Sequence, residues 1–257
     1  MPGATARQLS PETTITPTII TTVITTIMAE DALYDLMTWM SPMWPIGAFA
    51  HSSGLEWAVE VGHVTNREST RQWIADLIGH GPVRNDMVLF VHGWRAITAG
   101  APGRLAGLAE LSLAAQTGLE RRVEATAQGA AFRKIAIATS GKAAFDAVAH
   151  VDDDGLTYPI AVACLTASRA VPLQQALTAF AHGVTANLVS AAQRLVPLGQ
   201  TDGQLVLRDL RATIADIVAA LEDLPEGDPF DQIGGAALVA EIGCMAHETQ
   251  YTRLFRT

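Results

Sequence analysis

The sequence predicts an all-α protein, a single-domain helical bundle of roughly ten helices. Apolar residues recur at intervals of three and four along most of the chain, which is the spacing of one helix face. Aromatic residues make up only 6% of the 257 residues, while alanine and leucine are abundant. Such side chains suit closely packed helices better than a β-sandwich. The breaks between periodic segments, such as Gly100–Gly103, are short turns, so the pattern requires no domain boundary.

Charge and composition exclude several classes of function. The chain has 17 Lys+Arg against 26 Asp+Glu and a net charge of -9, so neither nucleic acid nor an anionic membrane surface is an expected partner. The apolar stretch Thr18–Met28 is about half as long as a membrane-spanning helix. The two cysteines, Cys164 and Cys244, are too far apart for a CxxC metal site. We therefore expect reduced thiols and a cytoplasmic location.

The N-terminal residues differ from the rest of the chain. Residues 1–28 are rich in threonine and proline, and we expect a flexible extension there. The alternative is that the β-branched run Ile19–Ile27 adds a strand to a partner or packs on the domain. The helical domain, including the C-terminal partner-binding tail, then covers residues 29–257.

A first helix is predicted from Glu30 until prolines 42 and 45 end it. Its expected buried face consists of Leu33, Leu36, Met37 and Met40. The apolar loop Pro42–Phe49 follows. We expect this loop to pack into the core, and docking against another protein is the alternative.

The central helices follow from capping signals and periodicity. Thr65 and Glu68 have the spacing of a capping box, which marks a helix start. The buried stripe after it is predicted to be Trp73, Ile74, Leu77 and Ile78. Further helices are predicted over Met87–Ile97, Leu105–Leu113 and Val123–Ile137. We expect the acidic run Asp152–Asp154 to be a surface loop, since no EF-hand spacing follows.

Two long helices are predicted in the last third of the chain. Pro172 suits the first position of a helix, whose apolar face is Leu173, Leu177, Phe180, Val184, Leu188 and Leu195. A second capping box, Thr201 with Gln204, precedes a seam of Leu207, Leu210, Ile214, Ile217 and Leu221. The seam suits either an intramolecular bundle or a helix–helix dimer. A last helix from about Asp231 leads into the segment His247–Thr257.

The sequence contains no catalytic signature. Ser140–Ala143 is the nearest approach to a phosphate loop, but it lacks the required first glycine and the final Ser or Thr. Neither an HExxH nor a GxSxG motif is present. Cys244 and His247 have a spacing that would suit nickel or zinc, but two ligands do not make a site. We predict a protein that is not an enzyme and that has no cofactor.

The last residues of the chain have the composition of an interface. Tyr251, Leu254 and Phe255 lie among Arg253 and Arg256, and aromatic residues and arginine are enriched at protein interfaces. A frayed C-terminus would leave such large apolar side chains exposed to water. We therefore predict a tail that is docked or bound to a partner.

Three motifs, in this order, resemble the UreF family of urease accessory proteins. They are PIGAFAHSSGLE (Pro45–Glu56), ANLVSAAQRLVPLGQTDGQ (Ala186–Gln204) and HETQYTRLFR (His247–Arg256). The resemblance covers roughly residues 30–257. Ser53 departs from the family, which usually has glycine there; if this position needs a positive φ, serine adds about 1 kcal/mol of strain.

The resemblance implies a cytoplasmic homodimer that binds UreD and, with it, recruits the GTPase UreG to deliver nickel to apo-urease. Such a protein is a chaperone component without catalysis of its own. The residues that it implies for partner binding are His247, Glu248, Tyr251, Arg253, Leu254, Phe255, Arg256, Gln200, Asp202, Gln204, Arg194, Ser52 and Glu56.

Two alternative functions stay open at this point. A GTPase-activating or regulatory partner of UreG would place Arg194, Gln200 or Gln204 near the phosphates of the nucleotide. A direct nickel carrier would use Cys244 and His247.

The predicted architecture also has consequences for variants. Removing residues 253–257 should abolish UreG recruitment without deleting a core residue. Leu188→Asp should destabilise the fold by several kcal/mol, because it buries an unpaired carboxylate.

Overall fold

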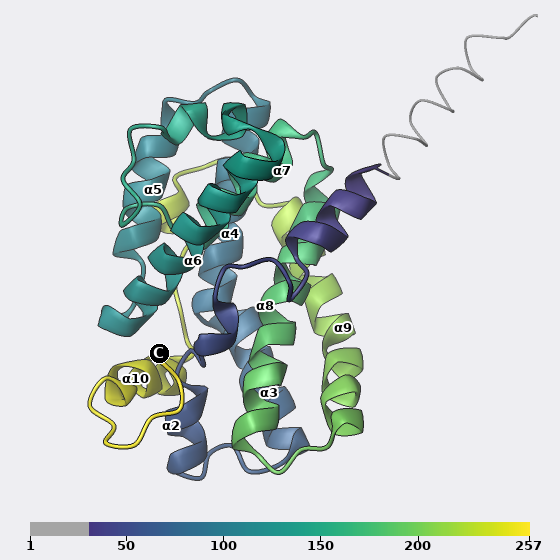
Figure 1. Ribbon diagram of the computed structural model, residues 1–257, viewed down its shortest axis with the longest axis vertical. Helices are drawn as coiled ribbons and strands as arrows, with labels where there is room; N and C mark the ends of the chain where they lie inside the picture. The colour runs from purple at the N-terminus through teal and green to yellow at the C-terminus, as the bar shows by residue number, and fades with distance from the viewer. Residues whose placement is uncertain (1–30) are drawn as a thin grey trace, which may run out of the picture.

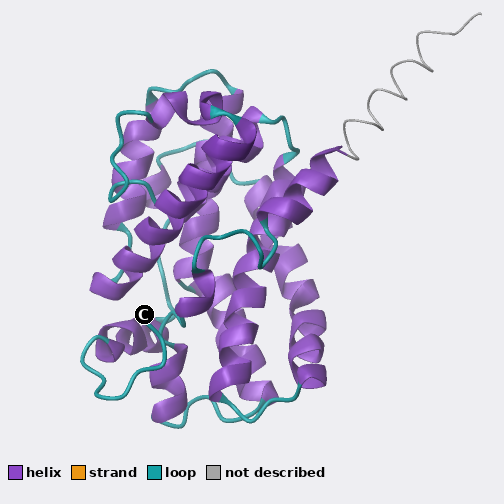
Figure 2. Cartoon of the chain, viewed as in Figure 1, coloured by secondary structure: helices purple, strands orange, loops and turns teal. Residues whose placement is uncertain are grey.

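The structure, a computed structural model, describes residues 31–257, and the predicted extension over residues 1–28 lies outside them. Within the described residues every regular element is a helix, so the predicted all-α class is confirmed (Figures 1 and 2). Helical residues 31–39 come first. The α-helices that follow are α2 (Leu55–Glu60), α3 (Arg67–His80), α4 (Pro82–Thr98), α5 (Arg104–Ala114), α6 (Gly118–Ser140), α7 (Tyr158–Ser168), α8 (Leu173–Leu195), α9 (Gln200–Glu222) and α10 (Leu238–His247). Three 3₁₀ helices are η1 (Ala48–Ala50), η2 (Lys142–Val148) and η3 (Pro229–Asp231).

Helix α4 lies at the centre of the bundle and packs against α3, α5, α7 and α8 (Figure 1). The run from Met87 to Val91 is fully buried. A helix that is covered on all sides has to be apolar all round, and this run is. Helices α8, α9 and α3 pack together, as do α6 and α7, and α10 contacts α2 and α6.

The predicted faces of the long helices are confirmed. All four residues of the predicted α3 stripe are buried, and Leu188 on α8 is only 3% exposed. On α9, the seam residues Leu210, Ile214 and Leu221 are buried, and the helix packs against α8 and α3. The seam therefore serves packing within this chain.

The prediction for the first helix is wrong in part. Leu33 and Met37 are exposed, at 57% and 67%, and the face that packs on the core is formed by Ala32, Leu36 and Trp39. Both faces are apolar, so periodicity could not choose between them. The loop that follows is also only half packed. Trp44 and Ile46 contact the core, whereas Met43 and Phe49 are exposed.

Several helices begin close to the predicted capping residue in the sequence but are capped by a different residue. The side chain of Asn66, not Thr65, caps α3 and accepts a hydrogen bond from Ser69 N (3.0 Å). Pro172 is the residue before α8 rather than its first residue. Helix α9 begins at Gln200, and Asp202 accepts a hydrogen bond from Gly199 N (3.3 Å). The predicted boundaries are thus correct within a few residues, but the capping partners differ.

The last helix starts later than predicted, at Leu238 instead of about Asp231. After η3 the chain runs past α3 and α4, where Gly234 N donates to Asn85 Oδ1 (2.9 Å) and Ala236 N donates to His80 O (2.8 Å). Adjacent glycines at 234 and 235 disfavour a helix there. This connection places α10 beside α2, away from α9 (Figure 1).

Candidate interaction site

The C-terminal tail, residues 248–257, folds back onto the molecule beside α2 and α10 (Figure 1). Ser52 N donates to Thr257 O (2.6 Å), and Arg256 N donates to Ala50 O (2.8 Å). The side chain of Phe255 is part of the hydrophobic core and is 4% exposed. The expectation that residues 253–257 contain no core residue is therefore wrong, because sequence cannot show which face of an irregular tail is buried.

Glu56 of α2 is a buried acceptor for the tail. Its carboxylate accepts hydrogen bonds from Leu254 N (2.6 Å) and Phe255 N (2.9 Å). It also contacts His247 Nε2 at 3.0 Å. A buried carboxylate is costly unless hydrogen bonds satisfy it, and here two backbone amides donate to it.

His247 joins α2 and α6. It is fully buried, and its Nδ1 lies 2.6 Å from Glu120 Oε2, so both ring nitrogens face carboxylates. Each ring nitrogen therefore has a polar partner, as a buried imidazole requires. Arg253 Nη1 donates to the other oxygen of Glu120 (2.9 Å). The guanidinium of Arg253 thus lowers the cost of burying the Glu120 carboxylate.

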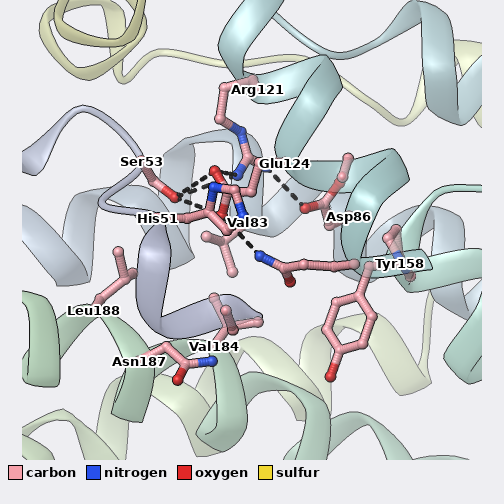
Figure 3. Close-up of a pocket in the computed structure, with 14 residues that line it drawn as sticks. His51, Ser53, Val83, Asp86, Arg121, Glu124, Tyr158, Val184, Asn187 and Leu188 are labelled. Carbon is pink, nitrogen blue, oxygen red and sulfur yellow. Dashed lines mark hydrogen bonds and ion pairs between the residues drawn. The ribbon is translucent and has the colours of Figure 1, made fainter. Parts of the chain in front are cut away.

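A second buried group of polar side chains contacts the end of the tail, and Figure 3 shows its members His51, Ser53, Asp86, Arg121 and Glu124. Arg121 pairs with Glu124 (2.9 Å) and Asp86 (3.2 Å), and Thr257 Oγ1 donates to Glu124 (3.3 Å). Burial raises the pKa of the Asp86 carboxyl, and Arg121 opposes this shift. The ring of His51 contacts Thr257 Oγ1 through Nδ1 (2.8 Å). Burial lowers the pKa of His51, which favours the neutral ring.

Ser53 sits in this group with a strained backbone. Its φ is +51°, so the position does need the left-handed conformation that favours glycine. Its hydroxyl donates to the Glu124 carboxylate (3.1 Å), a bond that glycine could not make. The strain of serine is therefore offset by a buried hydrogen bond.

Glu248, predicted to bind a partner, is engaged inside the chain. Its Oε1 accepts hydrogen bonds from Leu119 N (2.7 Å) and Glu120 N (3.4 Å), the free amides at the start of α6. The side chain of Thr117, the residue before this helix, makes no capping hydrogen bond. A carboxylate from the far end of the sequence therefore caps α6.

The remaining predicted residues fall into two groups. Arg194 donates to Phe49 O (2.7 Å), and its guanidinium lies 4.2 Å from the centre of the Phe255 ring, so it anchors the tail. Gln200, Asp202 and Gln204 begin α9, which lies across the bundle from α10 (Figure 1). The structure does not bring these three to the tail.

The outer surface of this region carries a group of exposed apolar side chains. Four side chains of α10 point outward and are exposed: Leu238, Val239, Ile242 and Met245. We call them the α10 stripe. Tyr251 and Leu254 of the tail are exposed as well, as are Leu119 and Val123 of α6. Sequence reasoning missed the stripe, although a short helix in which Glu241 and His247 are the only titratable residues besides Cys244 was a usable signal.

The pair Cys244 and His247 does not form a metal site in this geometry. No group of three or more potential metal ligands occurs among residues 31–257. Burial raises the pKa of Cys244 to about 12, so the thiolate that would bind a metal is disfavoured. Both nitrogens of His247 already contact carboxylates.

Comparisons with known proteins agree with these motifs. A family model described as UreF matches residues 64–211. The chain is 42% identical over 226 residues to the urease accessory protein UreF of Rhodopseudomonas palustris strain HaA2, covering 88% of this chain and 94% of that protein. It is 43% identical over 226 residues to the protein of the same name from Bradyrhizobium diazoefficiens, with 88% and 92% covered. None of the helices among residues 31–257 is long and apolar enough to span a membrane.

Proposed function

The chain belongs to the UreF family of urease accessory proteins, and we propose that it acts in urease maturation as a non-catalytic adaptor between UreD and the GTPase UreG. In this role it holds the two proteins together while nickel is delivered to apo-urease. The proposal includes a cytoplasmic location, a homodimer, and one domain over residues 29–257.

One observation carries the proposal: α10 and the tail are held in place by buried contacts, and both carry exposed apolar side chains on the outside. Buried bonds to Glu56, Glu120 and Glu124 hold this region in one position. The α10 stripe, with Tyr251 and Leu254, then faces solvent. Clustered exposed apolar side chains on a rigid base are typical of a protein–protein interface.

We assign the α10 stripe to UreD and the exposed part of the tail to UreG. Long-lived complexes have more apolar interfaces than transient ones, and the stripe is wholly aliphatic apart from the thioether of Met245. The tail exposes both the aromatic ring of Tyr251 and the side chain of Arg256, a mixed surface that suits a GTPase that has to leave after turnover.

The geometry favours neither alternative function. A residue that acts on the phosphates of a partner's nucleotide has to be free to reach them, whereas Arg194 is held by Phe49 and Phe255. Gln200 and Gln204 lie at the start of α9, apart from the tail. For direct nickel carriage, neither Cys244 nor His247 is free to act as a ligand in this arrangement.

Substitution in the stripe tests the assignment of UreD. Ile242→Glu places a charge at its centre, and Phe230→Glu is a matched control on another exposed apolar residue. We expect Ile242→Glu to lose co-purification with UreD while its melting temperature matches that of the control. Equal recovery of UreD by the two variants would overturn the assignment.

Substitution of Tyr251 tests the assignment of UreG. Tyr251→Ala should lower UreG recruitment by the complex with UreD at least tenfold, because an exposed aromatic anchor is lost. Tyr34→Ala removes another exposed tyrosine ring, from the residue range 31–39, and serves as the control. Undiminished recruitment by Tyr251→Ala would show that UreG binds elsewhere.

A further inference from the structure

Residues from the 48–53 segment, α4, α6, α7 and α8 line a cavity inside the bundle (Figure 3). The space open to the centres of water molecules is about 40 Å³. One buried water needs about 10–15 Å³ of such space, so there is room for about two or three. The polar part of the wall consists of His51, Ser53, Asp86, Arg121, Glu124 and Gln128, all of them buried. Apolar residues such as Val83, Ala125 and Leu188 complete it.

The guanidinium of Arg121 has one donor left over in this wall. Its terminal nitrogens pair with Asp86 (3.2 Å) and Glu124 (2.9 Å), and its side chain is only 7% exposed. Its Nε, which is also buried, finds no hydrogen-bond partner among residues 31–257. A buried donor without an acceptor is costly, and more so on a charged group. This nitrogen therefore requires an acceptor that the described part of the chain does not supply.

Two neighbours of Arg121 have hydrogen-bonding capacity to spare. His51 contacts Thr257 Oγ1 through Nδ1 (2.8 Å), which leaves Nε2 for a second partner. Gln128 donates through Nε2 to Glu124 Oε1 (3.3 Å), which leaves its carbonyl oxygen as an acceptor. The wall of the cavity thus contains both a donor and an acceptor. A molecule that satisfies both has to be small and has to accept as well as donate hydrogen bonds.

We infer that the cavity is a binding site for one or more water molecules, which accept a hydrogen bond from Arg121 Nε and donate to acceptors in the wall. Ions fit this wall less well. An anion would lie near Asp86 and Glu124, and a cation would lie near Arg121. Among residues 31–257 there is also no group of three or more potential metal ligands. Water carries no charge and meets neither penalty.

The bound water joins three parts of the chain that meet at the cavity. His51 and Ser53 precede α2, Asp86 belongs to α4, and Arg121 and Gln128 belong to α6. Water that bridges buried polar groups is part of the structure and is costly to remove. The site lies inside the chain and needs no partner protein, so the inference is independent of the proposed function.

A water-selective NMR experiment on the full-length chain tests the inference at the atom that carries it. Direct contact with a bound water gives the Nε–H of Arg121 a rotating-frame Overhauser peak whose sign is opposite to that of chemical exchange. We expect this peak at Arg121. Arg122, which is exposed on the same helix, is the control and should show exchange only. Absence of the Overhauser peak at Arg121 would overturn the inference.

Filling the cavity assigns the water to this site. Ala125 lies in the wall and is 4% exposed, so Ala125→Leu occupies the space that water takes. Magnetic relaxation dispersion of the oxygen-17 nucleus of water counts long-lived internal molecules. We expect its amplitude to fall by that of at least one water in Ala125→Leu. Ala127→Leu, at an exposed position of the same helix, should lose none. Equal amplitudes in the parent chain and Ala125→Leu would contradict the assignment.

Xenon provides a measurement on the parent chain that needs no variant. A dry apolar cavity takes up xenon, whereas a polar cavity that holds water does not. We expect the methyl resonances of Val83 and Leu188, which line the cavity, to keep their chemical shifts under xenon pressure. Xenon-dependent shifts of these methyl groups would show that the cavity is dry and would refute the inference, even if Ala125→Leu does not fold.

Discussion

Helices α4 and α10 are both apolar, but they are held in different ways. Helix α4 is covered on all sides, and its central run is fully buried among hydrophobic side chains. Helix α10 is covered on one side only, where His247 meets two carboxylates, while its other side carries the exposed stripe. Apolar burial is strong and non-directional, whereas a buried charged network is weaker in net terms and depends on geometry.

The difference indicates that the two regions have different roles. The centre of the bundle supplies stability, and the region of α2, α6, α10 and the tail supplies a defined surface. Buried ion pairs add little net stability, but removal of one partner is costly. Such a region can be ordered in one state and released in another, which suits a surface that binds other proteins.

The largest effect is expected in the centre. Phe90→Ala removes a fully buried ring from α4 and should lower the free energy of unfolding by about 3–5 kcal/mol. Urea denaturation monitored by circular dichroism measures the loss, and Phe230→Ala, at an exposed ring, is the control. If Phe90→Ala lowered the free energy of unfolding no more than the control, the contrast between α4 and α10 would be wrong, because α4 would then not be the main source of stability.

An intermediate and more local effect is expected at the tail. Glu56→Ala removes the acceptor of two amides and of His247, and it should destabilise the docked tail by about 2–3 kcal/mol. Amide exchange at Leu254 and Phe255 should therefore accelerate by roughly 30-fold or more, while residues of α4 keep their protection. Acceleration throughout α4 as well would show that the two regions unfold as one unit.

The smallest effect is a dependence on pH. Burial holds the pKa of His51 below its usual 6.5, while Glu124 and Glu120 oppose this shift and Arg121 and Arg256 add to it. Above pH 6.5 the ring is neutral in both the folded and unfolded states, and its full contribution is present. Below 6.5 the unfolded chain takes up the proton that the buried ring resists, so stability falls with decreasing pH.

Comparison with His51→Gln isolates this contribution. Between pH 7.0 and 5.5 the parent chain should lose more free energy of unfolding than His51→Gln, because all other titrating groups are common to both. Urea denaturation at the two pH values measures the difference. An equal loss in the two proteins would show that His51 does not contribute to the acid sensitivity.

Most of the long helices were predictable because their signals are local. The stripe of α3 and the seam of α9 repeat every three to four residues, and the structure buries them as expected. The prediction failed where the local signal is ambiguous. Leu33 and Met37 lie on one of two apolar faces, and only the neighbouring helices determine which face is covered.

The candidate site was predictable only in part. Composition and the family resemblance singled out the tail, Ser52, Glu56 and His247. Nothing in the sequence indicated Glu120 or Glu124, because isolated glutamates in a helix are usually solvent-exposed. The contact between Glu56 and His247 joins residues 191 positions apart, a separation that no periodic pattern spans.

The sequence by itself determined the all-α class, the approximate helix boundaries and the membership of the UreF family, since these depend on spacing and on contiguous motifs. Tertiary structure alone decided that the tail docks on Glu56 and Glu120, that Glu248 caps α6, and that the α10 stripe faces solvent. The physical reason is that hydrogen bonding and burial depend on distance in space, which the packing of the whole chain sets.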